Sequence, residues 1–420
     1  MSGLRTLFEE LAGADGPPTR LRADEVYGAA RRRLRRRQAA WTVTGVVAGG
    51  LALGLGLQGL RPVPAVPEPV QTGGGAGPVV SVAATDAEHL YAGVRTCGGD
   101  DCPARLIGSD DGGRTWTVRQ EDFGDGEVDA PAPGVLLHTT ESMGDPSGAT
   151  GPKLIRHHHV STDGGRTWRE LQRVADPVAA VPGNGWLQCA PTSLDTPCKL
   201  LAVDPQTARM APLSAQPGLD VNATDAAPAS SGPWVIGISD THQYALALTR
   251  DRGRTWSVHA FDEAGAVQVT AASADGVTAY AIVSKRTDTA EPGATAAPGP
   301  AAAVLRTTDG GATWQAVDPG HTLPSGTGYY MDGDAYLAAD GSHVVLLRSD
   351  DRQRWFVSGD RGATYREARP SGLGEHITLS GQRPPVQTAV PGVYLAFDDR
   401  AAYRSTDGLS WTRIPIEPVR

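Results

Sequence analysis

SDDGGRTW, residues 109 to 116, is the first of six similar phrases along this chain of 420 residues. Each phrase has a serine or threonine, an aspartate two residues later, at least one glycine and a closing aromatic residue. Such self-similarity indicates a repeat architecture in which each copy marks one structural unit. The other copies are STDGGRTW (161–168), TRDRGRTW (249–256), TTDGGATW (307–314), SGDRGATY (358–365) and the shorter STDGLSW (405–411).

Each phrase is predicted to form a tight turn between two antiparallel strands. The aspartate can accept hydrogen bonds from backbone N–H groups just ahead of it, and this closes a local turn. Glycines such as Gly112 and Gly113 permit the positive φ that the turn needs. The closing aromatic residue begins the next strand and buries apolar surface against a neighbour. The residues given this structural role are Asp111, Trp116, Asp163, Trp168, Asp251, Trp256, Asp309, Trp314, Asp360, Tyr365, Asp407 and Trp411.

The phrases resemble the Asp-box, or BNR, repeat of sialidases, sortilin-type receptors, xyloglucanases and photosystem II assembly-factor-like propellers. Five copies fit the family pattern S/T-x-D-x-G-x-T-aromatic, and the sixth is one residue short, with Leu409 where glycine is usual. The resemblance covers most of the chain beyond residue 79. It implies an all-β fold, a β-propeller with these phrases as hairpin turns.

The spacing of the repeats predicts seven blades over residues 79–420. Between Trp168 and Trp256 lie 88 residues, too many for one blade of about 50 residues. Inside this interval, Lys199 to Leu213 holds two strand-like runs around an Asp-Pro turn. We interpret this segment as part of a further blade whose repeat has decayed.

The first 78 residues predict a membrane anchor. Residues 40–60 form an uncharged segment that is long enough for a transmembrane helix. Six arginines lie within residues 31–37, just before it. The positive-inside rule places residues 1–39 in the cytoplasm and the propeller outside. A cleaved signal peptide is the alternative, although the lead-in is long for one. Residues 61–78, rich in proline and glycine, then form a linker.

The basic cytoplasmic tail also contains a candidate for partner binding. Leu4, Leu7, Phe8 and Leu11 share one face of a predicted short helix. Residues 1–38 are therefore a possible contact for a cytoplasmic partner or for lipid.

Cysteine usage agrees with an extracytoplasmic domain. The chain has four cysteines, in two close pairs without the spacing of a zinc site. Two local disulfides, Cys97–Cys102 and Cys189–Cys198, are the simplest interpretation, and four separate buried thiols are the alternative.

Net charge limits the class of partner. The formal net charge is −9, although the tail is basic. An acidic outer domain argues against nucleic acid as the ligand. No motif calls for a cofactor or a metal. The tandem His157, His158 and His159 suggests a metal site, but alternate strand residues face opposite ways, so only His157 and His159 could share one. Histidines on a solvated strand face are the preferred interpretation.

An exo-sialidase is the enzyme that the resemblance most readily implies. The family's Arg-Ile-Pro signature precedes the first repeat, whereas Arg413-Ile414-Pro415 follows the last one here. The arginines Arg114, Arg166 and Arg254 lie within the turns themselves. A tyrosine nucleophile would have to come from Tyr329, Tyr330, Tyr394 or Tyr403, with no evident glutamate partner. A xyloglucanase would need a second propeller to complete its cleft.

The sequence therefore predicts a single-pass membrane protein with an extracytoplasmic seven-bladed propeller. We expect a binding or scaffold module for a protein, peptide or glycan at the central mouth, on the face away from the repeat turns. A membrane-tethered sialidase-like glycosidase is the alternative.

Overall fold

The chain divides into two compact units, Met1–Gln71 and Thr72–Arg420, in a computed structural model. The predicted tail and membrane segment lie outside the described residues, as does the linker up to residue 76. The structure describes residues 77–95, 103–125, 127–143, 154–190, 198–225, 234–262, 266–273, 275–286, 298–317, 323, 330–349, 352–374, 377, 386–388 and 390–416. All that follows concerns these residues.

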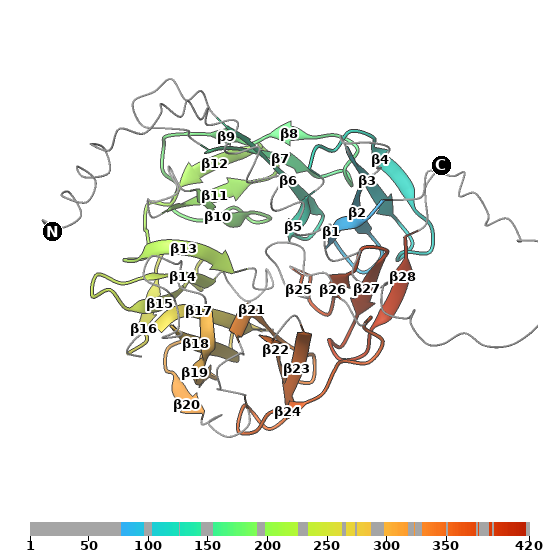
Figure 1. Cartoon of the computed structure of the whole chain (residues 1–420). Coiled ribbons are helices and arrows are strands. Elements are labelled where there is room, and N and C mark those ends of the chain that lie inside the picture. The colour runs from blue at the N-terminus through green and yellow to red at the C-terminus, as the bar shows by residue number, and fades with distance from the viewer. Residues whose placement is uncertain are drawn as a thin grey trace, which may run out of the picture. The chain divides into compact units, whose positions relative to one another are not determined.

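The second unit is a ring of seven four-stranded sheets, which confirms the predicted seven-bladed β-propeller (Figure 1). The described residues contain strands and no helix. Blades 1 to 4 comprise β1 (Val79–Ala84), β2 (Leu90–Arg95), β3 (Ala104–Ser109), β4 (Thr117–Gln120); β5 (Val128–Ala132), β6 (Val135–Met143), β7 (Leu154–Ser161), β8 (Arg169–Glu170); β9 (Gln172–Arg173), β10 (Trp186–Ala190), β11 (Lys199–Asp204), β12 (Arg209–Pro212); and β13 (Asp220–Asp225), β14 (Trp234–Ile238), β15 (Tyr244–Leu248), β16 (Ser257–Ala260). Blades 5 to 7 comprise β17 (Ala266–Ser273), β18 (Ala279–Arg286), β19 (Pro298–Thr307), β20 (Gln315–Val317); β21 (Tyr330–Leu337), β22 (His343–Ser349), β23 (Arg352–Ser358), β24 (Arg366–Glu367); and β25 (Val386–Gln387), β26 (Tyr394–Phe397), β27 (Ala401–Ser405), β28 (Thr412–Pro415).

Six blades have their strands in sequence order, each pair antiparallel. Figure 1 shows the first strand of each of these blades nearest the centre of the ring and the fourth at the rim. All six repeat turns connect the third strand to the fourth, so they lie at one end of every sheet. The hairpin between the second and third strands lies at the opposite end, because the strands alternate in direction.

Blade 3 is built differently and carries no repeat turn. Its strands are ordered β10-β11-β12-β9, and the outermost strand, β9, precedes the other three in the chain. β9 pairs with β12 in parallel, and the backbone N–H of Gln172 donates to the carbonyl of Ala208 at 2.8 Å. The blade thus lacks the hairpin in which the other six carry the phrase. The predicted strands around Asp204-Pro205 are β11 and β12.

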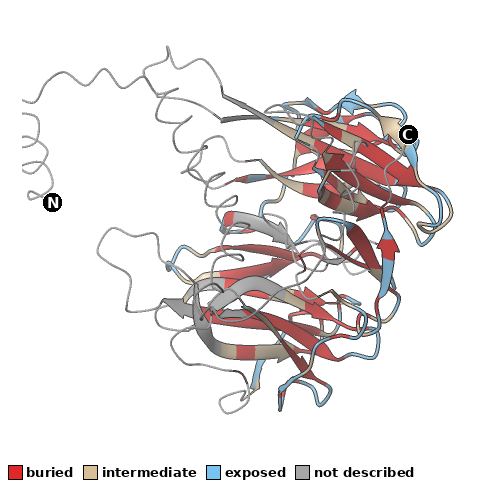
Figure 2. Ribbon diagram, turned by 45° about the vertical axis from the view of Figure 1, so that its right-hand side comes forward, coloured by how far each residue is buried: buried red, intermediate tan, exposed pale blue. Residues whose placement is uncertain are grey.

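The core of the propeller lies between blades. Buried apolar residues form seven clusters, and each cluster joins two neighbouring blades around the ring. Figure 2 shows buried residues on the strands and exposed residues mainly on turns. Each sheet is therefore stabilised by burying both faces against its neighbours.

One glycine with positive φ in each repeat turn allows close contact with the preceding blade. A Cβ added at Gly165 in blade 2 would lie 2.6 Å from Leu106 Cδ2 of blade 1, and one at Gly113 would lie 2.5 Å from Ile414 Cγ2 of blade 7. Both glycines have positive φ, 78° and 92°. The glycine is thus required twice over, by the backbone conformation and by the neighbouring blade.

Blades 7 and 1 close the ring without sharing a strand. Each of their sheets consists of four strands consecutive in the chain. Val79, Leu90, Leu395 and Ile414 belong to the apolar cluster between them. The backbone N–H of Val79 also donates to the carbonyl of Asp399 at 3.1 Å. Side-chain packing therefore carries most of this closure.

Candidate functional site

The seven innermost strands form the candidate site, because they surround the centre of the ring. They are β1, β5, β10, β13, β17, β21 and β25 (Figure 1). These strands contain no lysine, arginine, histidine or glutamate. Their charged residues are all aspartates: Asp129, Asp220, Asp225, Asp332 and Asp334. The charged positions on these seven described strands are therefore all acidic.

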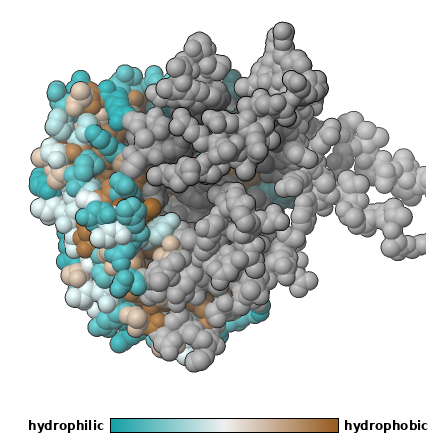
Figure 3. Space-filling model, turned by 60° about the vertical axis from the view of Figure 1, so that its left-hand side comes forward, coloured by the Kyte–Doolittle hydropathy of each residue, from teal (hydrophilic) through white to brown (hydrophobic). Residues whose placement is uncertain are grey.

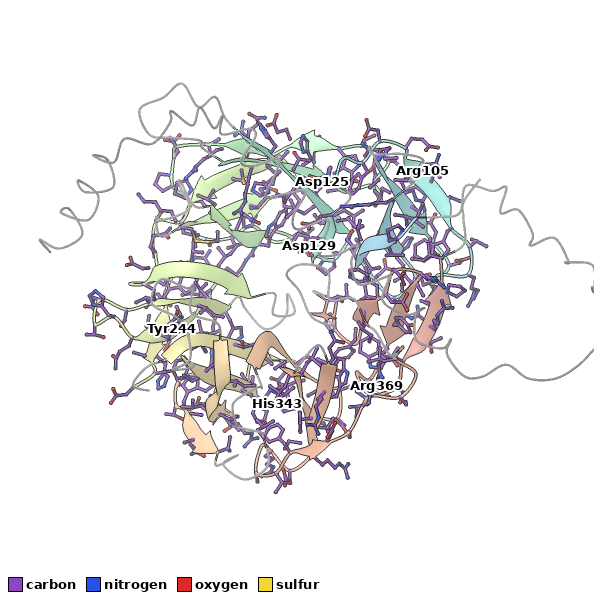
Figure 4. The ribbon with its side chains drawn as sticks, in the orientation of Figure 1. Arg105, Asp125, Asp129, Tyr244, His343 and Arg369 are labelled. Atoms are coloured by element: carbon purple, nitrogen blue, oxygen red, sulfur yellow. A yellow bond between two sulfur atoms is a disulfide. The ribbon has the colours of Figure 1, made fainter. Side chains whose placement is uncertain are left out.

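Three of these aspartates lie in the half of their strand away from the repeat turns. β13 runs parallel to β15, which leads directly into the turn at 249–256, so Asp220 at the start of β13 is at the far end. The same reasoning applies to Asp129 on β5 and to Asp332 on β21. Asp220 is exposed, and Asp129 lies at the inner edge of its sheet (Figure 4). Blades 2, 4 and 6 thus each have an aspartate in this half of the innermost strand.

The loops that would complete this mouth are largely beyond what the structure describes. Segments 96–102, 144–153 and 287–297 connect second to third strands and lie outside the described residues. The described turn at this end of blade 4, 239–243, carries the exposed Asp240.

The repeat-turn aspartates close their own turns. Asp251 Oδ1 accepts from the backbone N–H of Thr255 at 2.8 Å and from the Thr249 hydroxyl at 2.9 Å, while its Oδ2 accepts from the Thr255 hydroxyl at 2.6 Å. These hydrogen bonds lower the pKa of Asp251 to about 2. The aspartates of the other turns, Asp111, Asp163, Asp309, Asp360 and Asp407, accept from the hydroxyl residue two positions before them in the same way. These carboxylates are engaged in the fold and lie at the rim.

The closing aromatic residues lie in the clusters between blades. Trp411 and Tyr365 are buried, whereas the other four are half-buried. In the shortened sixth turn, Gly408 donates its backbone N–H to the Ser405 hydroxyl at 2.7 Å. In the other five turns, the glycine four residues after the first serine or threonine makes the same hydrogen bond. The half-buried residues are Trp116, Trp168, Trp256 and Trp314.

Cys189 and Cys198 are joined by a disulfide with a Cα–Cα distance of 5.4 Å. It links the innermost strand β10 to the residue before β11, across the first hairpin of blade 3. Cys97 and Cys102 lie outside the described residues.

Two of the candidate nucleophiles, Tyr394 and Tyr403, are hydrogen-bonded within the fold. The Tyr394 hydroxyl donates to the carbonyl of Leu337 at 2.8 Å, and burial raises the pKa of Tyr394 to about 12. The Tyr403 hydroxyl donates to Asp398 Oδ2 at 2.6 Å, and its pKa is raised by burial and then by that carboxylate. A raised pKa opposes nucleophile formation. Arg413 lies on the outermost strand β28, and Tyr329 and the side chain of Tyr330 are not described.

The tandem histidines divide between the two faces of blade 2. His158 is buried and its Nδ1 contacts the Thr139 hydroxyl at 2.9 Å, while His157 Nδ1 contacts Glu170 at 3.2 Å. His159 is paired across the sheet with His138, whose ring stacks on Phe123 at 3.9 Å. Among the described residues no three histidine, cysteine or acidic side chains are placed to hold a metal ion.

His343 is a buried titratable residue outside this site that the sequence analysis did not single out. It lies at the start of β22 between blades 5 and 6, fully buried, and stacks on Tyr280 with 4.3 Å between ring centroids (Figure 4). Its Nδ1 is 2.7 Å from the hydroxyl of Tyr365, the one repeat turn that closes on tyrosine. The tyrosine that stands in place of tryptophan in that repeat was the sequence feature that could have pointed to a polar partner such as His343.

The surface in view offers little apolar area for docking. Val258 and Val277 are the large hydrophobic residues exposed within the described ranges. Figure 3 shows hydrophilic and hydrophobic residues interspersed on the described part of the face in view. No helix among the described residues has the length and hydrophobicity to cross a bilayer.

Comparisons with known proteins give a fold likeness at low identity. No protein-family profile and no curated protein matches the chain. The chain is similar to the GH74 xyloglucanase from Xanthomonas campestris, with 15% identity and a TM-score of 0.33 over 80% of this chain and 46% of that one. It is also similar to YCF48 bound to D1 peptide, with 13% identity and a TM-score of 0.28 over 80% and 81% of the two chains. A third likeness is to the α-L-arabinanase from Penicillium chrysogenum complexed with arabinobiose, with 11% identity and a TM-score of 0.36 over 81% and 96%.

The chain thus spans less than half the length of the xyloglucanase. At these identities and TM-scores, the comparisons do not distinguish a ligand or a reaction for this chain.

Proposed function

We propose that this chain is an extracytoplasmic binding propeller that takes a cationic peptide segment of a partner protein at the centre of its ring. The observation that carries the proposal is the composition of the seven innermost strands, which hold five aspartates and no basic residue. Aspartates gathered around the centre of the ring attract a cationic segment and disfavour an anionic one. The six repeat turns support a relationship to the Asp-box (BNR) propellers.

The same composition argues against the sialidase alternative. Sialidases hold an anionic sugar carboxylate with three arginines, and no innermost strand supplies one. Tyr394 and Tyr403, two candidates for the nucleophile, instead bond to Leu337 and Asp398. Neither group is therefore available as the nucleophile of a retaining hydrolysis.

Membrane attachment through residues 40–60 belongs to the same proposal. It is supported by the uncharged segment, by the arginines of 31–37 and by the Cys189–Cys198 disulfide, which is typical of oxidising compartments. The ring would then face the outside while the tail stays in the cytoplasm.

The experiment is a pair of assays on the full chain purified in mild detergent. Fluorescein-labelled heptalysine should bind more tightly than labelled heptaglutamate by anisotropy, and the preference should weaken with salt. 4-Methylumbelliferyl sialoside should release no fluorophore. Equal binding of the two peptides would overturn the proposed ligand class, and sialoside turnover would establish the glycosidase instead.

A further inference from the structure

The seam between blades 5 and 6 contains a titratable side chain in an apolar setting. His343 is 0% exposed, and its ring contacts Tyr280 and Tyr365 of the apolar cluster between blades 5 and 6. The ring of His343 is parallel to that of Tyr280 within 15°. One imidazole is thus enclosed between two sheets.

The hydrogen bonding of His343 is complete on one side only. Its Nδ1 pairs with the Tyr365 hydroxyl, and its Nε2 has no hydrogen-bond partner among the described residues. The neutral ring carries one proton and can leave Nε2 as a bare acceptor. A protonated ring would place a second N–H and a positive charge against apolar side chains, which is costly without a partner.

The charged groups around the seam do not compensate such a charge. Burial alone lowers the pKa of His343, to about 3. Arg306 Cζ lies over the ring of Tyr280, 5.9 Å from its centroid, and Arg361 and Asp360 act on Tyr280 from the repeat turn of blade 6. Asp360 is committed to its own turn through Thr364 and Ser358.

We propose that acid opens the propeller at the seam between blades 5 and 6, through protonation of His343 in the opened state. The sign follows from linkage. An imidazole whose folded-state pKa is depressed stabilises the closed seam fully above the ordinary pKa of 6.5, and this stabilisation falls as pH drops below that value toward about 3. The opening equilibrium should rise about 100-fold between pH 7.5 and pH 4.5, from the ratio of protonated to neutral imidazole in the open state.

Two other buried histidines lie at different seams. Burial lowers the pKa of His138, which lies between blades 1 and 2, to about 4, and the Asp125 carboxylate opposes this shift. His158 lies on the opposite face of blade 2 with the Thr139 hydroxyl on its Nδ1, and burial lowers its pKa to about 4. Blade 7 contains no histidine in its strands and turns from 386 to 415 and provides an internal reference.

The test is hydrogen–deuterium exchange of the full chain at pH 7.5 and pH 4.5, corrected for intrinsic exchange. The repeat-turn aspartate of blade 6, Asp360, has a pKa of about 2 and stays ionised at both values. Protection in β18 and β22 should fall about 100-fold more than protection in β27. An equal change in all three strands would overturn the proposal.

Two substitutions distinguish the effect of the His343 imidazole from that of the Tyr365 hydroxyl. His343→Gln keeps a group that can bond to the Tyr365 hydroxyl but cannot titrate, so the excess loss of protection at pH 4.5 should disappear. Tyr365→Phe removes the hydroxyl and keeps the imidazole, so the excess loss should remain, as it should in His138→Gln. Retention of the excess in His343→Gln, or its loss in His138→Gln, would contradict the assignment.

Discussion

At the scale of single residues, the repeat phrase is explained by turn closure and contact between blades. Asp251 satisfies a backbone N–H and two hydroxyls within its own turn, and Gly165 presses against Leu106 of the preceding blade. The sequence predicted the first of these roles from the chemistry of aspartate. It could not predict the second, because the neighbouring blade's side chain is set by the ring and not by the turn.

Gly165 should be more sensitive to a methyl group than Gly134. Both have positive φ, 78° and 73°, but a Cβ at Gly134 meets nothing within 4 Å. Gly134→Ala should lower the free energy of unfolding by about 1–2 kcal/mol through backbone strain alone. Gly165→Ala should lose a further 1–3 kcal/mol, roughly, because the buried Leu106 must be displaced. Urea denaturation measures both; equal losses would show that Leu106 yields freely.

The repeat-turn aspartates should make the fold resistant to mild acid. The pKa of Asp251 is about 2 in the folded chain against an ordinary 3.8, so its contribution is present above pH 3.8 and is lost as pH falls through about 2. Asp251→Asn should therefore be less stable than the parent at pH 5, with a shallower loss of stability between pH 4 and pH 2. Thermal denaturation across this range is the measurement.

At the scale of elements, the count of seven blades followed from the sequence, and the construction of blade 3 did not. The interval between Trp168 and Trp256 indicated an extra blade, and β11 and β12 occur where two strands were predicted. Nothing in Gln172-Arg173 distinguishes a strand that pairs forward with β12 from a continuation of β8. A two-residue strand has too little pattern to reveal its partner.

The parallel pairing of β9 predicts a position-specific effect of proline. Gln172→Pro removes the N–H that donates to Ala208, so it should destabilise the chain by about 1–3 kcal/mol. Arg173→Pro, one residue on, removes none of the bonds that Gln172 and Val174 donate to blade 3. Urea denaturation of the two variants is the comparison. A larger effect at Arg173 would contradict the described pairing.

At the scale of the whole molecule, the fold was more predictable than the site. The repeat phrase occurs six times and is recognisable in the sequence, whereas the inner aspartates are scattered from Asp129 to Asp334 without a motif. Only the ring brings them to one place, because each sheet turns its first strand inward. His343 was missed for the same reason, since its burial depends on blade 5.

The proposed membrane topology predicts opposite results for two fusions in a bacterial host. Alkaline phosphatase joined after residue 420 should be active, because it folds only where disulfides form. The same enzyme joined after residue 38 should be inactive, because the arginines at 31–37 keep this segment inside. Activity of the second fusion, or inactivity of the first, would reverse the assignment.

The most direct test of the proposed function is the effect of one inner carboxylate on peptide binding. Asp220→Asn changes the exposed inner strand of blade 4, and Asp176→Asn removes the same charge from an exposed residue that follows the outermost strand of blade 3. Removing a charge in contact with the ligand in water costs about 1 kcal/mol, or about 5-fold in affinity. Anisotropy titrations of the full chain with labelled heptalysine should show this loss for Asp220→Asn and little change for Asp176→Asn. Equal affinities for the two variants would contradict binding at the centre of the ring.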